Sequence, residues 1–113
     1  MTDATSTEET GWTSLGPVDE LFSSRNCRAL ELEGTAIGLF RVEGEIYAID
    51  DICSHGNARL TEGDVDGFEV ECPLHAGVFD IRSGKALTAP VTRDVRRHTL
   101  RVQAGQVFIR LCR

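Results

Sequence analysis

The chain has 113 residues, of which 41% are hydrophobic, and its formal net charge at pH 7 is −6. This length supports one domain with a modest core. The acidic balance argues against nucleic-acid binding, so the arginines at 93, 96, 97 and 101 are expected on a solvated sheet face. No hydrophobic run approaches the ~20 residues that a membrane-spanning helix needs.

The first residues are polar and acidic, without the basic start and apolar centre of a secretory signal. We therefore expect a disordered lead over 1–11, a single domain over 12–113, and a cytoplasmic protein.

Short segments with strand character recur along the chain, separated by turn residues. Several alternate hydrophobic and polar residues, whereas residues 36–42 are apolar and β-compatible. We expect strands at residues 12–15, 27–32, 36–42, 45–49, 68–72, 77–81, 98–102 and 107–111. Val18 to Leu21 is expected as a turn or helical connection, and Glu43-Gly44 as a tight hairpin turn. No segment keeps a 3.6-residue period, so the predicted class is all-β with short antiparallel strands.

Two pairs of metal-binding residues stand out. Cys53 and His55 form a C-x-H pair, Cys72 and His75 form a C-x-x-H pair, and sixteen residues separate them. Two cysteines and two histidines at one point suit either a zinc ion or a two-iron cluster. Zinc fingers usually place like ligands next to each other in sequence. Here each pair mixes the two types, which favours a cluster that takes one ligand for each iron from each loop.

The segment from Cys53 to Val91 resembles the cluster-binding region of Rieske proteins, most closely the small Rieske ferredoxins of bacterial aromatic ring-hydroxylating dioxygenase systems. The resemblance lies in residues 53–58, 60–63, 70–75, 77–80, 83–87 and 89–91, and extends more weakly from about Trp12 to Leu111. It implies stacked antiparallel sheets, with the cluster-binding loops (about 50–91) in a small subdomain at one tip.

The resemblance also implies one Rieske [2Fe–2S] cluster per chain. Cys53 and Cys72 would bind the inner iron as thiolates, and His55 and His75 would bind the outer iron, which takes up the electron. Gly56 and Gly77 would let the backbone approach the cluster.

Pro90 matches a loop that covers the cluster in the family, although a plain turn proline explains it equally well. High-potential Rieske proteins carry a disulfide at positions that match Ala58 and Leu74, and hydroxyl donors at positions that match Gly77 and Phe79. None of these four side chains supplies those groups, so we expect a potential near the low end of the Rieske range, roughly −150 mV.

The implied function is that of a monomeric one-electron carrier. It would take electrons from an NADH- and flavin-dependent ferredoxin reductase and pass them to a terminal Rieske non-haem iron oxygenase that attacks an aromatic compound. The chain itself is not expected to be an enzyme. It lacks a G-x-G-x-x-G fingerprint, and only His98 remains for a non-haem iron site. We expect His98 to be an exposed strand residue.

Three alternatives stay open: the small Rieske subunit of a nitrite reductase, the ferredoxin of a diiron monooxygenase, and a zinc-stabilised interaction module. Cys27 and Cys112 are expected to be inert thiols, because a disulfide is disfavoured in a reducing cytoplasm. Acidic residues flank the first ligand pair, at Asp50, Asp51, Glu62, Asp64, Asp66, Glu69 and Glu71. They would either steer a cationic partner or keep the protein soluble.

Overall fold

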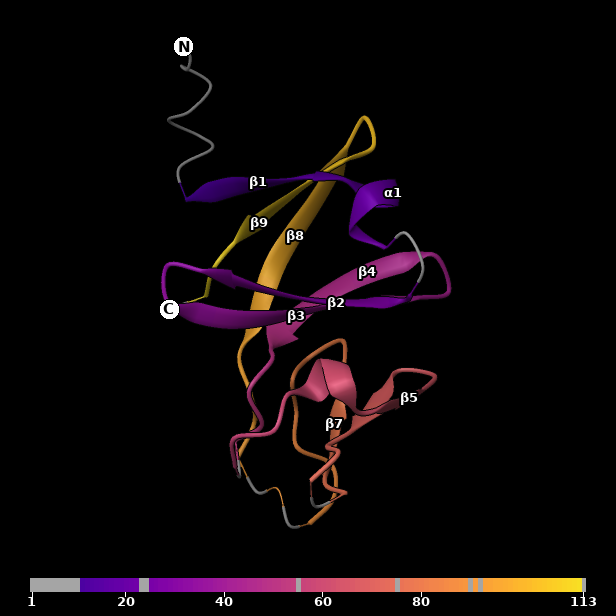
Figure 1. The fold of residues 1–113 in the computed structure, drawn as a ribbon, viewed down its shortest axis with the longest axis vertical. Coiled ribbons are helices and arrows are strands. Elements are labelled where there is room, and N and C mark those ends of the chain that lie inside the picture. The colour runs from indigo at the N-terminus through magenta and orange to yellow at the C-terminus, as the bar shows by residue number, and fades with distance from the viewer. Residues whose placement is uncertain are drawn as a thin grey trace.

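The structure, a computed structural model, describes residues 11–22, 25–54, 56–74, 76–89, 91 and 93–112. Within these ranges the helices are short: α1 (Val18–Leu21) and the 3-10 turn η2 (Leu60–Glu62). The remaining regular structure is β, arranged as two antiparallel sheets (Figure 1). The predicted all-β class is therefore confirmed. No helix in the described ranges is long and apolar enough to span a membrane.

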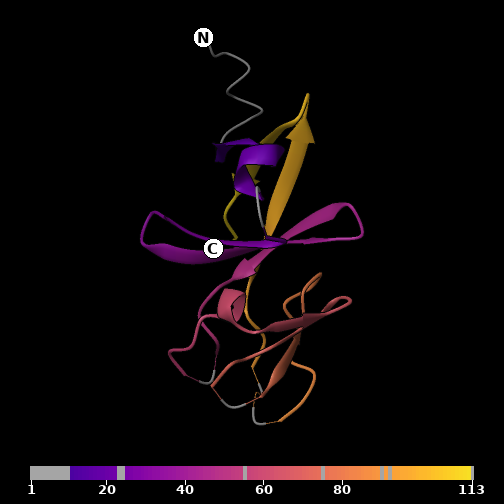
Figure 2. The same ribbon diagram turned by 45° about the vertical axis from the view of Figure 1, so that its right-hand side comes forward.

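The larger sheet has six strands in the order β1-β9-β8-β4-β3-β2. Its strands are β1 (Trp12–Pro17), β2 (Cys27–Leu32), β3 (Thr35–Val42), β4 (Glu45–Asp50), β8 (Arg97–Gln103) and β9 (Gln106–Arg110). The smaller sheet has the order β5-β6-β7. Its strands are β5 (Asp64–Asp66), β6 (Glu69–Glu71) and β7 (Val78–Asp80). Two views of the ribbon show the smaller sheet beneath the larger one (Figures 1 and 2).

Three tight hairpins build the larger sheet. Their turns are Glu33-Gly34, Glu43-Gly44 and Ala104-Gly105, and both residues of each turn have positive φ, between 52° and 83°. Two consecutive positive φ values give the turn whose twist matches that of the flanking strands. The predicted hairpin at Glu43-Gly44 is confirmed, and the other two use the same geometry.

Strand β3 lies between two hydrophobic cores and contributes side chains to both. Ile37 and Leu39 join a core with β9 and α1, while Phe40 and Val42 join a core with the smaller sheet. Alternate residues of a strand point to opposite faces, so a strand buried on both faces needs a nearly continuous apolar sequence. This double burial explains the apolar run of residues 36–42.

The smaller sheet is inserted between β4 and β8. These two strands pair at only two positions, Ala48 with His98 and Ile49 with Arg97. Beyond these pairs the chain leaves the larger sheet after Asp50, the last residue of β4, and returns to it at Arg97, the first residue of β8. Asp50 donates its backbone N–H to the carbonyl of Arg96 at 2.9 Å. We call this crossing the neck; it joins the larger sheet to the smaller one.

Candidate metal centre

The first ligand loop, residues 51–60, is closed like a hairpin. The N–H of Leu60 donates to the carbonyl of Asp51 at 2.7 Å, and the N–H of Cys53 donates to the carbonyl of Ala58 at 2.9 Å. The N–H of Gly56 then turns back to the carbonyl of Cys53 at 3.3 Å. These bonds hold Cys53 on a tight local turn, as the C-x-H spacing predicts. His55 lies outside the described residues.

The second ligand loop, residues 72–77, connects β6 to β7. At its base the N–H of Cys72 donates to the carbonyl of Gly77 at 2.7 Å, and the N–H of Ala76 donates to the carbonyl of Cys72 at 3.0 Å. Ala76 has φ of 64°, a conformation uncommon for a residue with a Cβ. The short loop therefore reverses the chain directly after Cys72. His75 lies outside the described residues.

The structure brings the two cysteines of the ligand pairs together in one core. Cys53 is 3% exposed and Cys72 is 1% exposed, and both belong to the apolar cluster beneath β3. All four cysteines are described and none forms a disulfide. Two buried thiols on adjacent loops fit the inner, thiolate-bound iron of a Rieske cluster. No group of three potential metal ligands occurs among the described residues, a set that excludes both expected histidine ligands.

Glycine at position 77 is required by close packing. A Cβ built there would lie 2.6 Å from Cγ1 of Val91, which is itself 4% exposed. Gly77 was expected to let the backbone approach the cluster, and the structure adds a second reason, the contact with Val91. The N–H of Val91 donates to the carbonyl of Thr88 at 3.2 Å within a local turn, and the closeness of Val91 to Gly77 shows that the segment after β7 packs against the second loop. Pro90, expected in that covering loop or turn, lies outside the described residues.

A buried carboxylate lies at the base of the first loop. Asp51 is fully buried, and its oxygens accept hydrogen bonds from the N–H of Thr61 at 2.8 Å, the hydroxyl of Thr61 at 3.1 Å and Nη1 of Arg59 at 3.0 Å. From the sequence Asp51 was counted only among the acids that flank the loop. The sequence did not show that Asp51 is buried, because an Asp-Asp pair carries no local signal of which carboxylate faces the core.

The prediction that His98 is an exposed strand residue is wrong. Its side chain is buried, with Nε2 2.8 Å from Oδ1 of Asp50 and Nδ1 accepting the N–H of Cys112 at 2.9 Å. Arg96 donates from its backbone N–H and from Nε to Oδ2 of the same aspartate. Asp50, Arg96, His98 and Cys112 therefore form a clasp at the neck. Strand alternation alone did not predict it, because the partners lie 14 to 48 residues from His98.

Burial and hydrogen bonding act in opposite directions on Asp50. Burial raises the pKa of its carboxyl group, whereas hydrogen bonds from His98 and Arg96, together with the charge of Arg96, lower it. The net pKa lies below the ordinary value of 3.8. Asp50 is therefore ionised at neutral pH.

The remaining two cysteines lie outside the ligand loops. Sγ of Cys27 is 3.3 Å from the carbonyl of Thr61 and 3.4 Å from Nη2 of Arg25, and Cys112 is exposed near the end of the chain.

Apolar side chains are exposed next to the ligand positions. Leu74, between Cys72 and His75, is 67% exposed, and Ile52, directly before Cys53, is 36% exposed. The acidic residues of β5, by contrast, are exposed on a strand with no buried side chain. This three-residue strand was not predicted, because it has no apolar face to produce an alternating pattern.

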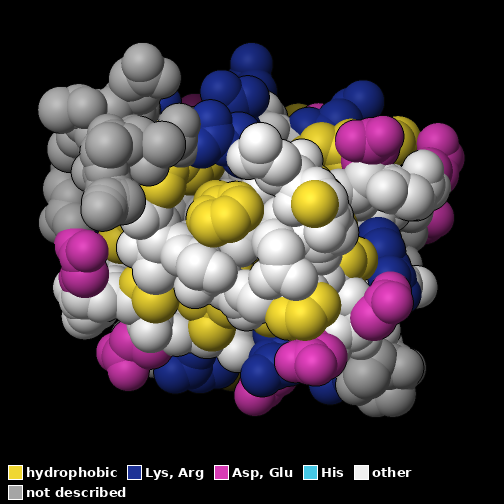
Figure 3. Space-filling model, turned by 90° about the horizontal axis from the view of Figure 1, so that it is seen from above, with side chains coloured by type: hydrophobic (Ala, Val, Ile, Leu, Met, Phe, Trp, Pro, Cys, Tyr) yellow, Lys and Arg dark blue, Asp and Glu magenta, His cyan; other side chains and the backbone are white. Residues whose placement is uncertain are grey.

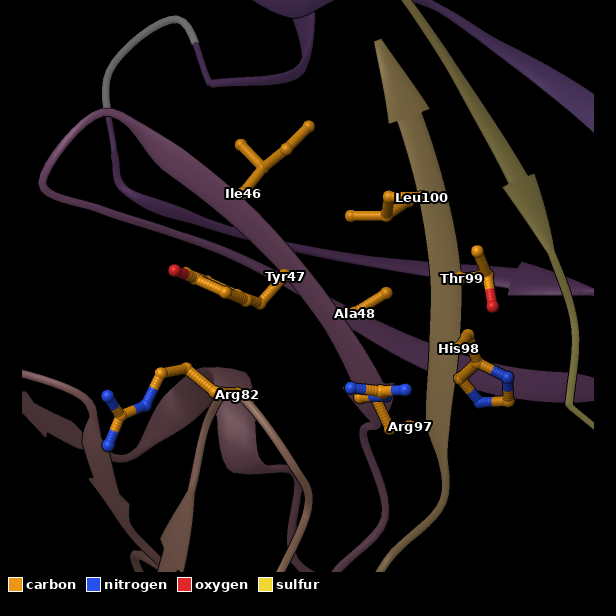
Figure 4. Close-up of a pocket in the computed structure, with 8 residues that line it drawn as sticks. All are labelled: Ile46, Tyr47, Ala48, Arg82, Arg97, His98, Thr99 and Leu100. Carbon is orange, nitrogen blue, oxygen red and sulfur yellow. The ribbon is translucent and has the colours of Figure 1, made fainter.

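A groove of about 340 Å³ opens where β4 and β8 part. Figure 4 shows Arg82 below Tyr47, with its guanidinium directed away from Arg97, while the ring of His98 lies on the other side of β8. Its lining contains no carboxylate and no thiol.

The end of the molecule that carries β1, α1 and the β8–β9 turn has a mixed surface. Hydrophobic, basic and acidic side chains are interspersed there (Figure 3).

Comparison with known proteins agrees with the site. The family model of the Rieske [2Fe-2S] domain matches residues 11–99. The chain is 44% identical to the anthranilate 1,2-dioxygenase ferredoxin subunit of Burkholderia cepacia, over 96% of this chain and 97% of that protein. It is 48% identical to the ferredoxin component of the naphthalene 1,2-dioxygenase system of Pseudomonas putida, over 71% and 77% of the two chains.

Among solved structures, the ferredoxin of carbazole 1,9a-dioxygenase from Nocardioides aromaticivorans IC177 superposes with a TM-score of 0.82. The two chains are 27% identical, with 89% of this chain and 98% of that chain covered. The cofactor of the family is a Rieske-type [2Fe–2S] cluster, which the two buried thiols fit. With most of its length matched by the family model and by curated relatives, the chain belongs to the Rieske [2Fe-2S] domain family.

Proposed function

We propose that this protein is a soluble, cytoplasmic one-electron carrier. It receives electrons from an NADH- and flavin-dependent ferredoxin reductase and delivers them to a terminal aromatic ring-hydroxylating dioxygenase. The observation that carries the proposal is the meeting of two buried thiols, Cys53 and Cys72, in one core on adjacent loops. The relatives that support the role are named ferredoxin components of naphthalene and anthranilate dioxygenase systems.

The proposed ligands are Cys53 and Cys72 for the inner iron, and His55 and His75 for the outer iron. The burial of both thiols supports the first assignment, because thiolates can neutralise a metal that water does not reach. The C-x-H and C-x-x-H spacing supports the second, since each histidine follows its cysteine by two or three residues. We further propose one cluster per chain, in a single domain over residues 12–113 that acts as a monomer.

The cluster supplies a one-electron couple when bound. The residues of this chain exclude water from the thiolates, orient the two loops and present an apolar contact surface. Leu74 and Ile52 are exposed on the two ligand loops, so a partner that covers them lies directly against those loops. One solved structure is the complex of the reduced oxygenase and the oxidised ferredoxin of carbazole 1,9a-dioxygenase. This protein is 29% identical to the matched chain of that complex. We propose the same kind of partner for this protein.

The named relatives favour a dioxygenase partner over a nitrite reductase or a diiron monooxygenase. A zinc-stabilised module is disfavoured by the family match, because the family binds iron and sulfide. The groove between β4 and β8 contributes no catalytic group to the proposal.

The first experiment is spectroscopic. Purified protein should be red-brown, contain two irons per chain, and give after dithionite reduction a rhombic electron paramagnetic resonance signal with average g below the free-electron value. His55→Ala and His75→Ala should each abolish this signal, whereas His98→Ala should retain it. A cluster that survives His75→Ala contradicts the ligand assignment, and a colourless protein with one zinc contradicts the function.

The second experiment tests the partners. A dioxygenase ferredoxin reductase and a terminal oxygenase are combined with NADH and an aromatic substrate, with and without this protein. Product formation should depend on its presence and saturate with its concentration. Leu74→Ser should slow product formation while leaving the potential and the spectrum unchanged, and Val102→Ser, an exposed apolar residue on β8, is the matched control. Equal turnover without the protein contradicts the proposal.

A further inference from the structure

We propose that Asp51 is a positioning residue for the cluster. Its buried carboxylate fastens the first ligand loop to the larger sheet, and so determines how firmly that loop retains the cluster. This inference rests on the proposed function, because it takes the loop that carries Cys53 and His55 to be a cluster-binding loop.

The carboxylate of Asp51 connects the two ends of the loop. Residue 51 begins the loop, and three donors to its carboxylate oxygens come from the far end, from Arg59 and Thr61. Arg59 also supplies the positive charge that a fully buried carboxylate needs. Three hydrogen bonds converge on this one side chain, and the one from Nη1 of Arg59 at 3.0 Å is also an ion pair, so the contact holds the two loop ends together.

The backbone of Asp51 continues the connection into the sheet. Its N–H donates to the carbonyl of Ala36 on β3 at 3.0 Å, while its carbonyl accepts the N–H of Leu60 at 2.7 Å. One residue thus contacts the start of β3, the end of the loop and η2. A loop with both ends fixed has fewer conformations to lose when it binds a ligand.

Two neighbours extend the attachment. The carbonyl of Thr61 accepts from Sγ of Cys27 and from Nη2 of Arg25, each at 3.3 Å, which ties η2 to β2 and the segment before it. Gly38 on β3 has no side chain, and the space beside it is filled by Asp51 and Thr61. A Cβ at position 38 would lie 3.0 Å from Cγ2 of Thr61 and 3.2 Å from Oδ1 of Asp51.

The second ligand loop is fixed by other means. Its base is closed by the backbone bonds between Cys72 and residues 76 and 77, and its outer side packs Gly77 against Val91. Changing Asp51 should therefore loosen the first loop and leave the second as it is. The expected consequence is faster loss of the cluster from a chain that is still folded.

The test compares cluster-loaded proteins. The main variants are Asp51→Asn and Thr61→Val. Asp51→Asn keeps the shape of the side chain but places an amide NH2, a donor, against the donors of Arg59 or Thr61. Thr61→Val removes one hydroxyl. Thr61→Ser retains that hydroxyl and should behave like the wild type. Val107→Ala, in the far core, lowers stability without touching the loop, and Asp66→Asn removes one exposed charge.

The rate at which the visible absorption bleaches is measured at a temperature where far-ultraviolet circular dichroism remains native. We expect Asp51→Asn and Thr61→Val to bleach roughly fivefold faster or more than the wild type, because the loss of one buried hydrogen bond corresponds to a rate change of about this size. Their electron paramagnetic resonance signals should shift or broaden. Val107→Ala should bleach only as it unfolds, and Asp66→Asn should match the wild type.

If Asp51→Asn and Thr61→Val bleach only on unfolding and keep the wild-type resonance signal, Asp51 has a purely structural role and the inference is wrong. If the wild type itself carries no iron–sulfur cluster, the proposed function fails first. The two failures are therefore distinguishable in the same set of samples.

Discussion

The backbone N–H of Cys112 donates a hydrogen bond to Nδ1 of His98 at 2.9 Å. Because an N–H group can only donate, Nδ1 carries no proton, and the ring holds its proton on Nε2, which faces Asp50 at 2.8 Å. His98 thereby joins the end of the described chain to the neck, where the larger sheet meets the cluster-binding part. Arg96 reinforces the same connection by donating from Nη1 to the carbonyl of Cys112 at 3.2 Å.

His98→Ala should destabilise the protein without removing the cluster. The change leaves the N–H of Cys112 and one oxygen of Asp50 without their partner and opens a cavity, so we expect a loss of about 2–3 kcal/mol in the free energy of unfolding. Urea titration measures the loss, and the visible spectrum reports the cluster. Arg97→Ala, the exposed neighbour, should change stability by less than about 0.5 kcal/mol. A folded His98→Ala protein without the Rieske spectrum would contradict this role.

Acid should weaken the clasp through Asp50. The pKa of its carboxyl group is lower in the folded protein than the ordinary value of 3.8. Such a group stabilises the fold above the unfolded pKa, and this stabilisation is lost as the pH falls through the folded pKa. Asp50→Asn should therefore be less stable than the wild type by about 1–2 kcal/mol near pH 6, and the difference should shrink toward pH 3.

Urea titrations of both proteins at a series of pH values test this expectation. Asp66→Asn, on the exposed strand β5, is the control and should show little difference from the wild type at any pH. If the difference in the free energy of unfolding between Asp50→Asn and the wild type stays constant down to pH 3, the ionised carboxylate of Asp50 is not the cause of that difference.

The reduction potential should lie near the low end of the Rieske range, roughly −150 mV. Ser54, the hydroxyl residue inside the first pair, donates to the carbonyl of Arg93 at 2.6 Å, and Gly77 and Phe79 carry no hydroxyl. Fewer donors near the sulfurs stabilise the reduced cluster less. Phe79→Tyr should move the midpoint to a more positive value in a potentiometric titration, whereas Phe68→Tyr should not. A clearly positive wild-type midpoint would overturn the argument.

Gly77→Ala should destabilise the second ligand loop by steric overlap. The new methyl group would lie 2.6 Å from Cγ1 of Val91, and overpacking of this kind costs about 1–3 kcal/mol. Val91→Ala removes the opposing methyl groups, so the double variant should be more stable than the two single effects added together predict. Urea unfolding of all four proteins gives the coupling energy. Strict additivity would show that the contact with Val91 is not the reason for the glycine.

The strands that alternate over five or more residues could be predicted from the sequence, because a face buried against a neighbour leaves a period of two. The same holds for Glu43-Gly44, because glycine accepts the positive φ that the second position of the turn requires. Strand β5 has no such signal. Its middle residue Val65 is 45% exposed, and the strand forms only because β6 offers it a hydrogen-bonding edge.

The ligand pairs are a local feature, so their spacing alone pointed to a mixed cysteine and histidine site. The structure adds that Cys53 and Cys72 share one buried core. It also distinguishes the two neighbouring aspartates, since Asp50 joins the neck clasp and Asp51 fixes the loop. From the sequence, Asp50 and Asp51 were both expected only as acids that flank the loop, because their surroundings are supplied by residues far along the chain.

The sequence by itself determined the all-β class, the order of the main hairpins and the identity of the family, because these depend on periodicity, turn chemistry and motif spacing. Only the tertiary structure decided that His98 is buried, that Gly77 packs on Val91 and that Asp51 holds the first loop. Each of these depends on which distant side chain lies within a few ångströms, and that distance is set when the sheets pack together.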